Sequence, residues 1–140
     1  CTPDQVARYQ GRLSGPLLDR IDLHVEVPAV APAELLHAPA GEPTARVQSR
    51  CVAARALALA RQGKENQALQ GAECDGHAPP SAPAGSFLRQ AAERLGWSAR
   101  STHRVLKVAR TIADLAGSAT LEAAHVAEAV QYRRGLTPTP

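Results

Sequence analysis

The sequence predicts a mainly α-helical protein, in which a short helix and one strand precede a four-helix unit. Three observations favour this fold class. Alanine, the best helix former, and aliphatic side chains dominate the apolar residues. Aromatic residues make up only 3% of the chain, which suits helices packed closely through small side chains. Beyond residue 43, the apolar positions recur at helical spacing.

The first elements are expected in residues 1–28. Residues 4–12 favour a short helix, which the Ser-Gly-Pro run at 14–16 should end. Apolar and polar residues then alternate strictly over residues 21–27, a pattern typical of a half-buried strand. A single strand is not stable without a sheet, so we expect residues 1–28 to be poorly ordered in this chain.

Residues 29–42 are rich in proline and alanine and predict a linker. The first helix of the four-helix unit is expected from Pro43, a residue that suits a first turn, to a stop at Gly63. One side of this helix carries a predicted core stripe formed by Val47, Cys51, Ala54, Ala58 and Gln62.

Three more helices are predicted after a loop at residues 71–85. Ser86 is expected to cap the second helix, which Gly96 ends, and Ser98 the third, which Gly117 ends. The third helix has the clearest amphipathic stripe: Thr102, Val105, Leu106, Ala109, Ile112, Ala113 and Ala116. A last helix should run from Thr120 to residue 134, followed by a frayed tail at residues 135–140.

Composition excludes few classes of function. The net charge of +3 and a pI of about 9.1 are typical of an ordinary solvated surface and do not identify a nucleic-acid binder. The three cysteines form no CxxC pair and no two histidines are four residues apart, so no metal site is expected. Three widely spaced cysteines fit a cytoplasmic protein with free thiols, and no membrane span or signal peptide is visible.

No catalytic motif is evident. The chain has neither a G-x-x-x-x-G-K-[ST] phosphate loop nor a G-x-G-x-x-G run. Residues 87–115 have the outline of a DNA-binding helix-turn-helix, and the second helix carries Arg100, Arg104, Lys107 and Arg110. An antiparallel helix pair with a glycine turn has the same outline. Arg110 and Asp114 are four residues apart, which indicates a structural ion pair.

The Asp-Arg-Ile-Asp run at residues 19–22 is, by itself, typical of a local salt-bridge cluster. Two longer blocks give it another meaning. The stretches "QVARYQGRLSGPLLDRIDLHVEVP" and "LGWSARSTHRVLKVARTIADLAGS", with "HVAEAVQYRR" after them, resemble the C-terminal part of the magnesium-chelatase-like AAA+ ATPases of the ComM/YifB type. The resemblance covers nearly the whole chain.

The resemblance implies a division into domains. Residues 1–28 would be the end of an AAA+ core, with its finger segment and last strand. Residues 29–42 would be a linker, residues 43–134 the helical lid, and residues 135–140 a tail. The chain would then be a fragment, with its nucleotide-binding motifs upstream and Cys1 at the end of a cysteine-rich stretch.

The resemblance also implies two site residues. Arg20 matches the arginine finger of related ATPase rings, a catalytic residue that reaches the nucleotide of a neighbouring subunit and stabilises charge during phosphoryl transfer. Arg100 matches sensor 2, a lid residue that contacts nucleotide and couples its state to lid movement. No metal ligand is implied.

The implied partners belong to the parent protein. It would bind ATP and Mg²⁺, assemble as a hexameric ring and move branched or single-stranded DNA during natural transformation. The fragment alone should bind no cofactor, hydrolyse no ATP and be monomeric. Two alternatives stay open: a helix-turn-helix DNA-binding module that uses residues 98–110, and magnesium insertion into a porphyrin.

Overall fold

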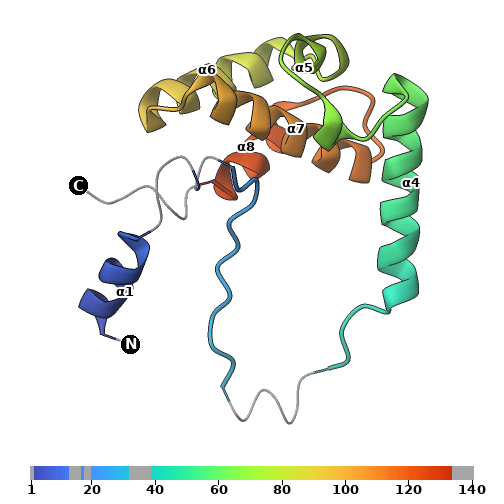
Figure 1. Ribbon diagram of the computed structural model, residues 1–140. Helices are drawn as coiled ribbons and strands as arrows, with labels where there is room; N and C mark the ends of the chain where they lie inside the picture. The colour runs from blue at the N-terminus through green and yellow to red at the C-terminus, as the bar shows by residue number, and fades with distance from the viewer. Residues whose placement is uncertain (1, 13–16, 18–19, 32–38, 134–140) are drawn as a thin grey trace.

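The computed structural model describes residues 2–12, 17, 20–31 and 39–133. The helices are α1 (Pro3–Gln10), α4 (Thr44–Gln62), α5 (Ala72–His77), α6 (Ala82–Leu95), α7 (Ala99–Leu115) and α8 (Ala123–Gln131), with a 3₁₀ turn η1 (Asn66–Ala68). Figure 1 shows α6, α7 and α8 gathered into one body, with α4 at one side and α1 lying apart. The mainly helical fold class is confirmed.

The core lies where α6, α7 and α8 meet. Helix α7 packs against α8 and α4, and α6 packs against α8. Small and β-branched side chains allow these helices to approach closely. The buried cluster consists of Ala78, Ala84, Leu88, Val105, Leu106, Ala109, Leu121, Val126, Ala129 and Val130. The stripe predicted on α7 is therefore largely confirmed.

Glycines end these helices where the sequence predicts. Gly63 and Gly96 adopt φ of 71° and 62°, the left-handed conformation that favours glycine. At the end of α6, the amide of Trp97 donates to the carbonyl of Ala92 at 2.9 Å. This bond satisfies a carbonyl that the helix would otherwise leave free.

Several predicted boundaries are wrong. Ser81 and not Ser86 occupies the N-cap position of α6, because Pro83 fits the first turn and lets the helix begin earlier. Residues 72–77, predicted as loop, form α5, which buries Cys74. Glu122 and not Thr120 caps α8, through a reciprocal capping box with His125.

The predicted strand is also absent. Residues 21–27 have no regular secondary structure, and the described part of the chain contains one isolated bridge, between Pro80 and Leu121. A strand needs a neighbouring strand to satisfy its backbone groups in a ladder, and the described residues place no strand beside this segment. The apolar side chains of Val25 and Val27 are accordingly exposed.

Helix α4 joins the core only near its C-terminal end. Ala54 and Ala58 are buried, whereas Val47 and Cys51 of the predicted stripe are exposed. Arg61, in the last turn of α4, forms an ion pair with Asp114 of α7. This ion pair, half-buried at Arg61 and buried at Asp114, joins α4 to α7 together with the contacts of Ala54 and Ala58.

Candidate nucleotide-responsive site

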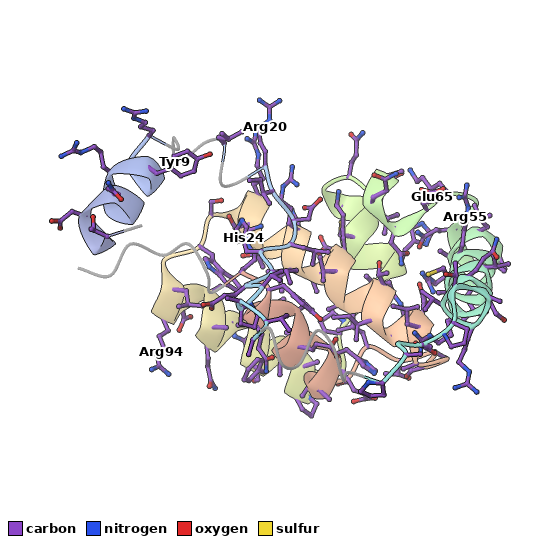
Figure 2. The ribbon with its side chains drawn as sticks, turned by 90° about the horizontal axis from the view of Figure 1, so that it is seen from below. Tyr9, Arg20, His24, Arg55, Glu65 and Arg94 are labelled. Atoms are coloured by element: carbon purple, nitrogen blue, oxygen red, sulfur yellow. The ribbon has the colours of Figure 1, made fainter. Side chains whose placement is uncertain are left out.

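The two arginines singled out from the sequence are both exposed. Neither guanidinium forms an ion pair or hydrogen bond with any residue that the structure describes. Figure 2 shows the Arg20 side chain directed away from the helices, with its backbone beside them. An unpaired guanidinium with its five donors is available for a planar or tetrahedral oxyanion such as phosphate.

Arg100 lies in the first turn of α7, where the helix dipole presents positive charge. The Ser98 hydroxyl oxygen caps this end by accepting a hydrogen bond from the amide of Ser101 at 3.2 Å. The first turn contains no acidic residue. A cation at this position is electrostatically unfavourable for the helix. The partial positive charge at the start of α7 and the charge of Arg100 together favour an anionic ligand.

A basic pocket of about 470 Å³ lies beside Arg100. Side chains at three- and four-residue spacing on α7 form one wall, and the turn before α5 forms the other. The lining residues are Leu69, Gln70, Gly71, Arg100, His103, Arg104 and Lys107. No acidic residue lines this pocket, so its field attracts anions.

The segment after Arg20 is held on the lid by polar contacts. Arg104 donates from Nη1 to the carbonyl oxygen of Arg20 at 2.8 Å and also pairs with Asp22. Arg133 donates to the carbonyl oxygen of Ile21 at 3.0 Å, and the amide of His24 donates to Tyr132 at 2.8 Å. Sequence reasoning missed this role of Arg104 and Arg133.

His24 is part of the same contact. Both ring nitrogens are shielded from solvent and have no hydrogen-bond partner among the residues that the structure describes. Burial lowers the pKa of His24, and the nearby charge of Arg133 lowers it further. The neutral imidazole is therefore the form that fits against the lid.

Arg110 and Asp114 are structural. Both are buried, at 2% and 3% exposure, and they form the ion pair that the sequence predicts. Arg110 also donates to the carbonyl oxygen of Ala119 at 3.0 Å. Burial raises the pKa of Asp114, but hydrogen bonds from Arg61 and Asn66 more than offset this and lower it overall. A carboxylate so fully occupied is not available to a ligand.

The basic face of α7 is partly covered by the chain itself. Arg104 contacts the segment at residues 20–22, and the Lys107 ammonium donates to the carbonyl oxygen of Gln67 at 3.0 Å. A recognition helix must present its basic side chains to a DNA groove. These contacts argue against α7 as the recognition helix of a helix-turn-helix.

Two family models match this chain. The model described as magnesium chelatase, subunit ChlI C-terminal, matches residues 41–133. The chain belongs to this family. The model described as magnesium chelatase, subunit ChlI, matches residues 1–35, the part that contains Arg20. The two matches meet between residues 35 and 41, within the part of the chain predicted as a linker.

The chain is also similar to curated proteins along nearly its whole length. It is 41% identical over 133 residues to Competence protein ComM of Haemophilus influenzae, covering 94% of this chain and 26% of that protein. It is 42% identical over 134 residues to the uncharacterised protein YifB of Salmonella typhimurium, covering 95% of this chain and 26% of that protein. The chain thus spans about a quarter of the length of these relatives. A ComM/YifB-type chain is therefore confirmed.

Membrane-spanning helices and metal-binding clusters are both absent from the described residues. No helix there is long and apolar enough to cross a membrane. No group of three or more His, Cys, Asp or Glu side chains is arranged to hold a metal ion in this part of the chain. Cys1 lies outside the described residues.

Proposed function

We propose that these residues form the lid and finger segment of an AAA+ ATPase that works as a ring. Arg20 supplies a guanidinium to nucleotide bound by a neighbouring subunit, and Arg100 contacts nucleotide from the lid. The observation that carries the proposal is the state of Arg20: its backbone is held on the lid while its side chain projects, unpaired among the described residues, into solvent.

The chemistry suits phosphoryl transfer. ATP with Mg²⁺ supplies the phosphoanhydride bond that is broken. A guanidinium presented from outside the subunit stabilises negative charge as it develops on the transferred group, and its planar fork binds two oxygens at once. The chain has no phosphate loop of its own, so Arg20 can serve only a nucleotide held elsewhere.

Arg100 fits a different task. It lies at the positive end of α7 and beside the basic pocket, both of which favour phosphate oxygens. A contact made in one nucleotide state and lost in another shifts the lid between two positions. Arg100 therefore reports the state of the nucleotide to the lid.

We extend the proposal to DNA because one relative is called a competence protein. The parent protein is then a cytoplasmic hexameric motor that promotes DNA branch migration during natural transformation. A DNA substrate should stimulate its ATP hydrolysis. Magnesium insertion into a porphyrin would instead give metal incorporation without any dependence on DNA.

The test uses a full-length subunit that ends in these residues. Arg20→Ala and Arg20→Lys should each lower kcat for ATP hydrolysis about a thousandfold or more, while nucleotide binding persists. Mixing Arg20→Ala subunits with subunits that cannot bind nucleotide should restore turnover, because each supplies what its neighbour lacks. Unchanged turnover in Arg20→Ala, or no rescue on mixing, would refute the proposal.

A further inference from the structure

The lid holds the segment that carries Arg20 through its backbone. Arg104 of α7 donates to the carbonyl oxygen of Arg20, and Arg133, just after α8, donates to the next carbonyl, that of Ile21. Asp22 accepts a second bond from Arg104. Hydrogen bonds from a charged donor are the stronger class, and here they fall on consecutive residues.

These hydrogen bonds fix the position of the Arg20 backbone without using the Arg20 side chain. Both arginines bind main-chain oxygens, so the guanidinium of Arg20 is left for another subunit. The segment has no sheet neighbours among the described residues, and its carbonyl oxygens need other donors. A flexible segment held at two adjacent carbonyls loses much of its freedom before any ligand arrives.

The same contacts connect the two candidate nucleotide-binding arginines. Arg104 lies one helical turn after Arg100 on α7, so their side chains share one face. Arg133 also donates to the Ser101 hydroxyl at 3.2 Å, in the first turn of that helix. A displacement of the first turns of α7 therefore moves the backbone of Arg20.

We propose that Arg104 and Arg133 are positioning residues that hold Arg20 in register with the lid and transmit movement of α7 to it. This inference rests on the proposed function, because it requires Arg20 to act on nucleotide. Neither arginine needs to touch nucleotide for this role. Their effect on turnover passes through Arg20.

The principal test is a double-variant cycle in the full-length subunit. Arg104→Ala should lower kcat for ATP about 10- to 100-fold, the effect expected from a displaced catalytic group, and change KM less than twofold. In an Arg20→Ala background, Arg104→Ala should have no further effect on kcat. Asp22→Asn should have a smaller effect than Arg104→Ala, since the carbonyl contact persists.

Arg94→Ala is the matched control. Arg94 is an exposed arginine of α6 that points away from the lid contacts, so its loss should leave kcat and KM unchanged. The outcomes separate the two proposals. Normal turnover in Arg20→Ala refutes the proposed function itself. Loss of turnover in Arg20→Ala with normal turnover in Arg104→Ala refutes only the positioning role, as does a further loss in the double variant.

The 140-residue chain offers a second measurement without ATP. The amide of His24 donates to the carbonyl oxygen of Tyr132, so its hydrogen exchange reports attachment of the segment. Arg104→Ala should speed this exchange tenfold or more and leave exchange in α7 unchanged. Equal exchange in the variant and the parent chain would overturn the positioning role. General acceleration across α7 would also overturn it, because Arg104 would then stabilise the helix itself and not the attachment of the segment.

Discussion

Asp114 of α7 accepts two hydrogen bonds from Arg61 of α4, at 2.7 and 2.9 Å, across 53 positions of the sequence. The same carboxylate pairs with Arg110 on its own helix. Asp114 is 3% exposed, so it is the shared buried counter-ion of two arginines that come from two helices.

Asp114→Asn should therefore lower the free energy of unfolding by about 3–5 kcal/mol, because it leaves the buried charge of Arg110 without its counter-ion. Urea denaturation of the 140-residue chain measures the change. Glu42→Gln is the control, since it breaks the exposed Arg50–Glu42 pair and should cost about 1 kcal/mol or less. Similar losses for the two variants would contradict the structural role of Asp114.

The ionisation of Asp114 should also make the free energy of unfolding depend on pH in the acid range. Its pKa is lower in the folded chain than in the unfolded one, so its contribution is complete above the unfolded pKa. The contribution is lost as the pH falls through the folded pKa. Stability should thus drop below about pH 4. Asp114→Asn should flatten that part of the profile, and an unchanged acid limb in the variant would contradict the assignment.

The ionisation of His24 should make the attachment of its own segment to the lid depend on pH. Burial and Arg133 lower its pKa, so the attached state favours the neutral ring. The attachment is complete above about pH 6.5 and weakens as the pH falls through the folded pKa. Amide exchange at His24 should accelerate between pH 7 and 5 beyond the intrinsic trend, and His24→Gln should abolish that excess.

A glycine inside α6 and the glycine that follows it should respond oppositely to alanine. Gly85 lies inside the helix, and an added Cβ would meet the Pro80 side chain at an ordinary 3.6 Å. Gly85→Ala should stabilise the chain by about 0.5–1 kcal/mol. Gly96 has a φ of 62°, so Gly96→Ala should destabilise it by about 1 kcal/mol. Thermal unfolding checks both, and shifts of the same sign would contradict the backbone assignment.

The two described cysteines should differ in reactivity. Cys51 is exposed on α4, whereas Cys74 of α5 is buried, and burial raises the pKa of its thiol. Because the thiolate is the reactive form, iodoacetamide should modify Cys51 first and Cys74 only on unfolding. Peptide mapping after timed alkylation distinguishes the sites. Early labelling of Cys74 would show that α5 opens readily.

The helices were predictable where one face stays apolar over several turns. Helix α7 met this condition, and its glycine stop was evident in the sequence. Helix α5 was missed because its six residues include a glycine and carry no period. It is stabilised by burying Cys74 against other segments, which is a tertiary effect that local patterns do not record.

The candidate site was predictable in part. Arg20 and Arg100 were found through a family resemblance, because an exposed arginine has no sequence signature of its own. The sequence placed Arg104 among the basic residues of a candidate DNA-recognition helix and Arg133 near the end of the last helix. Their partners are backbone carbonyl oxygens far along the chain, and any residue provides such an acceptor. No sequence pattern could have identified these contacts.

The Arg133 contact to Ile21 spans 112 positions, so forming it closes a loop that contains most of the chain. The entropy cost of closing a loop rises with its length, whereas contacts among α6, α7 and α8 close much shorter ones. Folding should therefore complete the helical body first and attach the segment last. Because residues 20–24 attach last, they should also detach more readily than the helices. Their detachment should leave the core of α6, α7 and α8 intact.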